Sequence, residues 1–221
     1  MVLNAKWIRP AQTTGDVCPV YSKQFSPDQN LSSVARATLS VTAMGVYEAS
    51  LNGKRIGDFV LAPGWTSYRH RLQVQTYDIT DLLSSENELS IIVGKGWYRS
   101  PLAWPDEAHR QEKAQIPAGL IALLTITYTD GSTQLLPTGA DWSAYESNVR
   151  FSEIYDGETY DAAFDPSSAP IAIAEFDGPS DTLIAQQGEK ITEQERILPA
   201  RIFTTPAGET VVDFGQEITG Y

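Results

Sequence analysis

The sequence predicts an all-β protein built as an antiparallel β-sandwich. Short segments in which apolar and polar residues alternate recur at intervals of about 8–12 residues, giving about ten to twelve candidate strands. No segment shows the periodicity of a long amphipathic helix. Hydrophobic residues make up 42% of the 221 residues, which is enough for a sizeable core. The strand spacing alone does not distinguish a jelly roll from an immunoglobulin-like sandwich.

The first hundred residues contain the clearest alternation. Leading strands are expected around Trp7-Ile8 and Val20-Tyr21, and a longer strand begins near Arg36. A second alternating segment ends in Asn52-Gly53, which predicts a type I′ hairpin turn because both residues accept a positive φ. The residues expected to share one face of the strand after Arg36 are Ala37, Leu39, Val41 and Ala43.

The next segment predicts a loop between the two sheets. Pro63 lacks the N–H that a central strand needs, so Leu61–Thr66 is interpreted as a crossing loop. Two returning strands are expected at Leu72–Thr76 and Leu89–Val93. A short helical turn, capped by Thr80 or Asp78, is expected between them.

The second half begins with a polar excursion over residues 99–118, with a helical turn around Asp106–Lys113. Gly119–Tyr128 is nearly all apolar and therefore predicts a central strand. Asp130-Gly131 turns the chain back into a strand at Thr133–Leu136, and another strand is expected at Arg150–Ile154.

A domain boundary is predicted at residues 165–181, which are rich in Pro, Ser and Asp. The chain is therefore divided into a domain at 1–175 and a region at 183–221. The latter contains strands near Thr182–Ala185, Arg196–Thr204 and Thr210–Phe214. Because it stops directly after an alternating segment, we expect it to be the truncated start of a second sandwich.

Charge and cysteine content exclude several functions. The chain carries 28 acidic and 16 basic residues, a net charge of −12, which disfavours nucleic acid and anionic membrane surfaces as partners. Cys18 is the single cysteine, so neither an intramolecular disulfide nor a cysteine metal cage can form. No signal peptide and no membrane-spanning apolar run of about 18 residues is present, so we expect a cytoplasmic protein.

Aromatic residues form the candidate carbohydrate-binding site. Their rings can stack on the apolar faces of sugars, although large aromatics also fill cores, and both interpretations remain open. Trp104 lies in the polar excursion and is the better candidate for an exposed ring. The candidate residues are Trp65, Tyr68, Trp97, Tyr98 and Trp104.

Carboxylates provide a candidate metal site and a weak case for catalysis. Asp156, Glu158 and Asp161 supply hard oxygen ligands that could hold Ca²⁺, but their spacing is not that of an EF-hand and Asp156-Gly157 is also a good turn pair. A glycosidase needs two carboxylates on opposite sides of one bond, and no such pair is marked here. No cofactor is required by any motif.

Several motifs in a fixed order resemble those of bacterial α-L-rhamnosidases. The resemblance spans the chain from Trp7 to Tyr221. The motifs are Gly45-Val46-Tyr47-Glu48, Leu51-Asn52-Gly53, Leu61–Thr66 with Tyr68, Gln75–Thr80, Gly96-Trp97-Tyr98, Tyr155–Ala162 and Val212–Gln216.

The resemblance implies a fold and a function. It implies a galactose-binding-like jelly roll followed by the first strands of another β-sandwich. It also implies the non-catalytic amino-terminal region of an inverting glycoside hydrolase, whose catalytic carboxylates lie in an (α/α)₆ barrel outside this chain. The expected partners are a rhamnose-containing carbohydrate and that barrel. The alternative is a purely structural sandwich that packs on the barrel without binding sugar.

Overall fold

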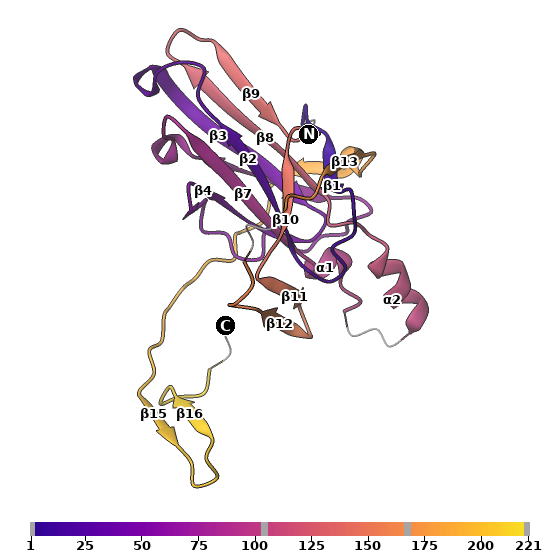
Figure 1. Ribbon diagram of the computed structural model, residues 1–221, viewed down its shortest axis with the longest axis vertical. Coiled ribbons are helices and arrows are strands. Elements are labelled where there is room, and N and C mark those ends of the chain that lie inside the picture. The colour runs from indigo at the N-terminus through magenta and orange to yellow at the C-terminus, as the bar shows by residue number, and fades with distance from the viewer. Residues whose placement is uncertain (1–2, 103–105, 166–168, 219–221) are drawn as a thin grey trace. The chain divides into compact units, whose positions relative to one another are not determined.

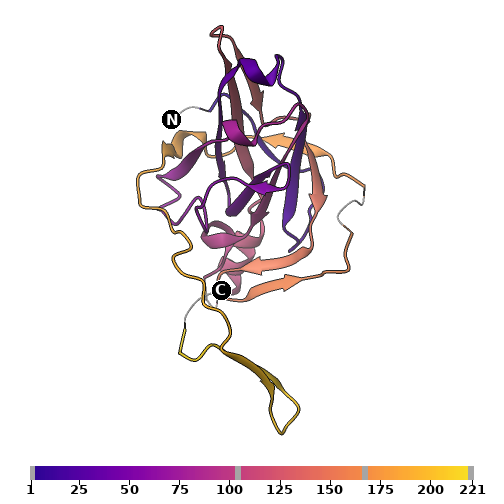
Figure 2. The same cartoon turned by 90° about the vertical axis from the view of Figure 1, so that its left-hand side faces the viewer.

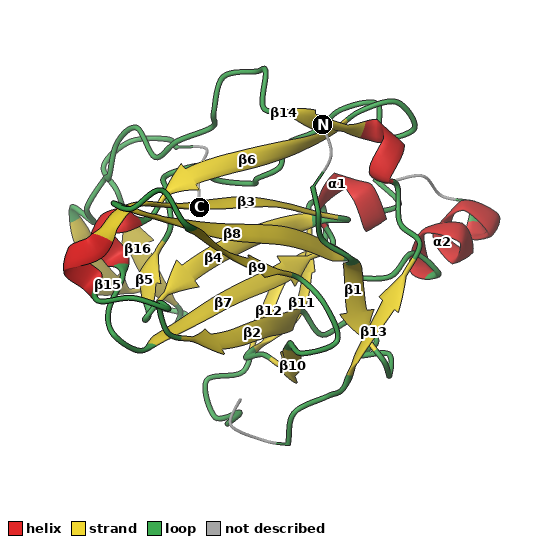
Figure 3. Cartoon of the chain, turned by 90° about the horizontal axis from the view of Figure 1, so that it is seen from above, coloured by secondary structure: helices red, strands yellow, loops and turns green. Residues whose placement is uncertain are grey.

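The computed structural model describes residues 3–102, 106–165 and 169–218 and divides the chain into two compact units, Met1–Lys190 and Ile191–Tyr221. The first unit is a β-sandwich with two main sheets (Figures 1 and 3). The predicted all-β sandwich is therefore confirmed. No helix in the described part of the chain is long and apolar enough to cross a membrane.

The larger sheet has seven strands, and its centre is formed by two long antiparallel neighbours that pair from Val34–Tyr128 to Ala43–Leu120. Its strands, in spatial order, are β13 (Ile173–Phe176), β1 (Trp7–Pro10), β8 (Leu120–Tyr128), β3 (Val34–Ala43), β6 (Leu72–Asp78) and β14 (Leu183–Ala185), with β9 (Thr133–Pro137) also paired to β8.

The smaller sheet has five strands and faces the larger one (Figure 3). In spatial order they are β10 (Ser143–Glu146), β2 (Pro19–Phe25), β7 (Asn87–Gly94), β4 (Val46–Leu51) and β5 (Lys54–Arg55). The β4–β5 turn is the predicted Asn52-Gly53 hairpin, and both residues have positive φ (53° and 75°).

The core lies between these sheets and follows the predicted alternation. Ala37, Leu39, Val41 and Ala43 of β3 are all fully buried. They meet residues from the opposite sheet in one apolar cluster, such as Ile91 of β7. A smaller cluster lies on the other face of the larger sheet, because Ile121 of β8 points away from its buried neighbour Leu120.

Short elements complete the first unit. Two 3₁₀ turns lie at Leu31–Ser33 and Ser180–Thr182, and a third at Thr80–Leu82 is the expected helical turn. At that turn the carboxylate of Asp78 accepts from the N–H of Thr80 at 3.0 Å. The remaining elements are α1 (Gly96–Arg99), α2 (Glu107–Ala114), β11 (Val149–Glu153) and β12 (Gly157–Tyr160).

The predicted boundary at 165–181 needs correction. β13 lies within this segment and pairs with β1 at an end of the larger sheet. β14, which we expected to begin the next domain, pairs in parallel with β6, and Leu183 is only 2% exposed. The first unit therefore extends to Lys190, because backbone pairing continues beyond the Pro-rich stretch.

The second unit contains one described hairpin, drawn in yellow in Figure 2. It joins β15 (Arg201–Thr204) to β16 (Thr210–Asp213), in agreement with the strands expected near these positions. Two of its apolar side chains, Ile202 and Val212, oppose each other in the ladder and are exposed.

Candidate functional site

Helix α1 separates two surface features at one end of the sandwich. Trp97 and Tyr98 of α1 meet Trp65 and Tyr68 of the connection between β5 and β6, which includes the predicted crossing loop, and these four residues are called the aromatic patch below. Lys95 and Arg99, at the two ends of α1, line a groove shared with α2 and the β11–β12 hairpin. Figure 1 shows these elements gathered below the two sheets.

The backbone explains why α1 begins where it does. Gly96 has φ +50°, and a Cβ built there would lie 2.5 Å from Cγ1 of Val46 and 2.7 Å from its backbone nitrogen. Because only glycine permits this close approach to β4, the turn holds Trp97 and Tyr98 beside the sheet end.

The crossing loop is held by its own hydrogen bonds. Thr66 Oγ1 donates to the carbonyl of Arg71 at 2.5 Å, and the hydroxyl of Tyr68 donates to the carbonyl of Gly64 at 3.1 Å. The loop is therefore a defined platform for Trp65.

The aromatic patch consists of two ring pairs. Trp65 and Trp97 stack with 6.2 Å between ring centroids and 10° between planes. Tyr68 and Tyr98 lie 4.5 Å apart at 39° and pack against the smaller apolar cluster. Burial raises the pKa of both tyrosine hydroxyls, so they remain protonated at neutral pH.

Exposure differs within the patch. Trp65 is 66% exposed, whereas the other three side chains are half-buried. The two interpretations of these rings therefore apply to different residues: the tyrosines are packing residues, and Trp65 presents a ring to solvent. Trp104, the fifth candidate, lies outside the described residues.

The three candidate metal ligands do not form a ligand set. Asp156, Glu158 and Asp161 are exposed on the β11–β12 hairpin and just after it, and Asp161 accepts from the N–H of Ala163 at 2.9 Å. No group of three or more His, Cys, Asp or Glu side chains within residues 3–102, 106–165 and 169–218 is arranged to hold a metal ion. Asp156 is instead the last residue of the hairpin turn, and Gly157, with φ +81°, begins β12.

The groove on the other side of α1 has a volume of about 390 Å³ and is called the charged groove. Seven of its residues carry charged side chains. The lining residues are Thr13, Gly15, Asp16, Lys95, Arg99, Pro101, Arg110, Lys113, Ala114, Phe151, Glu153 and Asp156.

A buried carboxylate forms one wall of the charged groove. Glu153 accepts a hydrogen bond from the hydroxyl of Ser100 and two from the backbone N–H groups of Tyr155 and Asp156, at 2.5 and 2.7 Å. Burial acts to raise the pKa of Glu153, but these hydrogen bonds outweigh it and lower the pKa below its ordinary value. The group is therefore ionised at neutral pH.

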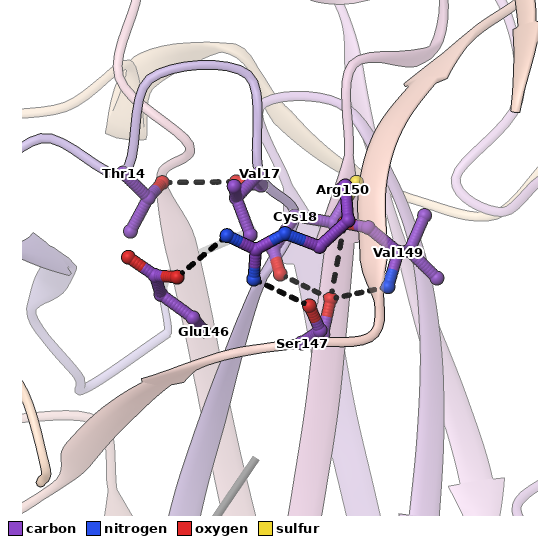
Figure 4. Close-up of polar contacts among 7 residues, drawn as sticks. All are labelled: Thr14, Val17, Cys18, Glu146, Ser147, Val149 and Arg150. Carbon is purple, nitrogen blue, oxygen red and sulfur yellow. Dashed lines mark hydrogen bonds and ion pairs between the residues drawn. The ribbon is translucent and has the colours of Figure 1, made fainter. Parts of the chain in front are cut away.

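The β11 wall is anchored to the sandwich through one turn. The hydroxyl of Ser147 donates to the carbonyl of Cys18 at 2.6 Å, and Cys18 N–H donates to the carbonyl of Val149 at 3.0 Å (Figure 4). Arg150 forms an ion pair with Glu146 at 2.9 Å in the same view. These contacts tie the start of β11 to the start of β2.

The sequence interpretation missed the charged groove. Its residues come from four separate segments, and Ser100 and Glu153 are 53 positions apart. A single sequence carries no signal for such a distant pairing. One indication in the sequence is Glu153, which lies within the expected strand Arg150–Ile154. A carboxylate that is buried in a strand is unfavourable unless it has a partner.

Comparison with known proteins identifies relatives of this chain. The family described as the "Alpha-L-rhamnosidase N-terminal domain" matches residues 32–195. An α-L-rhamnosidase from Streptomyces avermitilis is 36% identical over 198 residues, covering 85% of this chain and 19% of the relative. The chain thus spans about a fifth of the length of that curated relative.

Solved structures of α-L-rhamnosidases are also similar to this chain. Native α-L-rhamnosidase from Aspergillus terreus matches with a TM-score of 0.83 and 32% identity, covering 96% of this chain and 26% of that one. The Streptomyces avermitilis α-L-rhamnosidase complexed with L-rhamnose matches with a TM-score of 0.76 and 31% identity, covering 90% and 20%. These matches agree with the β-sandwich that the sequence predicted.

Proposed function

Because the chain belongs to the family of α-L-rhamnosidase N-terminal domains, we propose that it is the non-catalytic amino-terminal region of an α-L-rhamnosidase and that its aromatic patch binds rhamnose-containing carbohydrate. Hydrolysis is assigned to a catalytic barrel domain elsewhere in the parent protein. The chain itself acts by holding the substrate, and we expect it to be inactive alone.

The stacked tryptophan pair carries this proposal. One face of Trp65 is supported by Trp97, and two thirds of the side chain stays exposed. Rhamnose is a 6-deoxy sugar with an apolar methyl group and C–H faces, which suit an indole ring held in a fixed orientation. The hydrogen bonds within the loop reduce the entropy lost on binding.

The alternative function is purely structural. An exposed tryptophan on a rigid loop is also typical of a contact at a protein interface, so the patch could pack on the catalytic barrel. The two functions differ in what a Trp65 substitution changes: sugar affinity in the first case and the stability of the parent enzyme in the second.

Titration of the 221-residue chain with L-rhamnose at millimolar concentration, followed by NMR or calorimetry, tests the proposal. We expect saturable binding that Trp65→Ala weakens about tenfold or more, as expected for loss of a stacking ring. Tyr155→Ala is the matched control, because this side chain is also 66% exposed but belongs to another element. Addition of Ca²⁺ with and without chelator tests whether binding needs a metal.

Two outcomes would overturn the binding function. Absence of any response to L-rhamnose leaves the structural alternative, as does equal weakening by Trp65→Ala and Tyr155→Ala. Release of rhamnose from an aryl rhamnoside by the isolated chain would contradict the assignment of hydrolysis to another domain.

A further inference from the structure

The charged groove concentrates positive charge in a strongly acidic chain. Four of the chain's 16 basic side chains line it together with three of its 28 acidic ones, so its lining has a net charge of +1, whereas the chain as a whole has a net charge of −12. Such local accumulation against the overall charge is typical of a site for an anionic ligand. The four are Lys95, Arg99, Arg110 and Lys113.

Three of these cations have no acidic partner in the part of the chain that the structure describes. Its ion pairs include Lys95 with Asp16 at 2.6 Å, but none that involves Arg99, Arg110 or Lys113. Lys113 donates to a backbone carbonyl. These charges are therefore available to a ligand.

Arg99 is held in a fixed position. Its Nε donates to the carbonyl of Ile116 at 3.1 Å, whereas its two terminal nitrogens have no acceptor among residues 3–102, 106–165 and 169–218. A guanidinium fixed in this way leaves N–H groups free for a planar carboxylate. Arg110, on α2, is exposed at the same groove.

The acidic side chains of the groove narrow the choice of ligand. Asp16 is occupied by Lys95, and Glu153 is held by three donors of the chain itself. Asp156 has a free carboxylate within the described residues and can accept from a hydroxyl group. Because repulsion by these acidic side chains grows with the charge of an anion, the lining suits a molecule with one carboxylate and several hydroxyls better than a dianionic phosphate.

We propose that the charged groove binds a carboxylate-bearing sugar unit, a uronic acid, through Arg99 and Arg110. The volume of about 390 Å³ lies in the range of roughly 300–1,000 Å³ typical of small-molecule sites. The identification of the ligand as a sugar rests on the proposed carbohydrate-binding function. The groove would thus recognise an acidic unit of a rhamnose-containing glycan.

A pair of sugars that differ in one group tests the proposal on the 221-residue chain. D-galacturonate and D-galactose differ only in having a carboxylate or a CH₂OH group at C6. We expect calorimetry or NMR titration to show saturable binding of galacturonate, no binding of galactose at the same concentration, and weakening by added NaCl. Sodium acetate and sodium sulfate are the controls for a simple anion.

Substitutions assign the binding to the groove. Arg110→Gln alters an exposed side chain, so folding is preserved, and it is expected to weaken galacturonate binding roughly tenfold or more. Arg36→Gln removes the same charge from an arginine that is 64% exposed and paired with Asp78, and is expected to leave binding unchanged. Arg99→Lys keeps the charge but removes the planar guanidinium, and is expected to weaken binding as well.

The outcomes separate this proposal from the proposed function. Three results would each overturn the uronic acid site. Galacturonate could fail to bind, galactose could bind as tightly as galacturonate, or acetate or sulfate could bind as tightly as galacturonate. Loss of L-rhamnose binding in Trp65→Ala with unchanged galacturonate binding supports two independent sites. Galacturonate binding without any L-rhamnose binding would overturn the function of the aromatic patch and support the groove.

Discussion

Ser100 donates a hydrogen bond to the carboxylate of Glu153, which joins the residue after α1 to the last residue of β11. Both side chains are buried, with 0% and 7% exposure. The second carboxylate oxygen accepts from two backbone N–H groups of the hairpin turn. This one ionised group therefore connects α1, β11 and the turn that borders the charged groove.

Glu153→Gln is predicted to destabilise the fold by about 1–3 kcal/mol at pH 7, because hydrogen bonds to a buried charged acceptor are lost or weakened. The folded-state pKa of Glu153 lies below its ordinary value. Its contribution is therefore fully present above the unfolded-state pKa of about 4.3 and is lost as the pH falls through the folded-state pKa. Urea unfolding at pH 7 and at pH 3 measures both effects.

Glu86→Gln serves as the control for that experiment, since Glu86 is exposed and takes part in none of the ion pairs formed within the described residues. The stability difference between the native chain and Glu153→Gln should shrink at low pH, while Glu86→Gln should stay within about 0.5 kcal/mol throughout. A difference that persists unchanged at pH 3 would contradict an ionised Glu153.

The thiol of Cys18 is predicted to be unreactive in the folded chain. It is 3% exposed, and burial raises its pKa to about 11. A thiol-specific aromatic disulfide reagent at pH 8 should therefore react with the chain in denaturant and not in buffer. Rapid reaction of the native chain would show that the start of β2 opens.

The parts of the fold that follow from local chemistry were predictable from the sequence. Alternation in β3 correctly marked its buried face, and Asn52-Gly53 marked the hairpin, because both depend on neighbouring residues alone. The nearly all apolar run of β8 likewise predicted a central strand, and β8 has partners along both edges.

Long-range relationships were not predictable in the same way. The sequence marks both Trp65 and Trp97 as candidates, but it does not show whether each ring fills the core or contacts a sugar. The stacking of the two rings and their unequal exposure in the structure separate these interpretations. The predicted domain boundary at 165–181 differs from the structure for a similar reason. The pairing of β14 with β6 joins segments far apart in the chain, and the Pro-rich stretch before β14 does not indicate it.

Leu39→Ala is predicted to cost about 2–5 kcal/mol in the free energy of unfolding, because the side chain is fully buried between the two sheets and its removal leaves a cavity. Leu135→Ala is the matched control: this leucine is on β9 of the same sheet and is 49% exposed. Its substitution should cost less than about 1 kcal/mol. Denaturant unfolding of both variants compares them, and equal losses would contradict the assignment of the core.

Truncation is predicted to reveal the true end of the first unit. A chain ending at Lys190 should unfold at the same temperature as the first unit of the 221-residue chain, because it keeps β14 and the contacts that follow it. A chain ending at Thr182 loses the buried Leu183 and the backbone pairing with β6. It also loses the hydrogen bond from the N–H of Gln187 to the side chain of Gln73, at 3.0 Å.

Burial of a leucine side chain contributes about 1.5–3 kcal/mol, and a loss of this size lowers the melting temperature of a domain of 150–250 residues by roughly 2–4 °C per kcal/mol. The chain ending at Thr182 should therefore melt several degrees below the chain ending at Lys190, as measured by calorimetry. Equal melting temperatures would mean that β14 adds nothing to the sandwich and that the boundary lies in the Pro-rich stretch, where the sequence alone had suggested it.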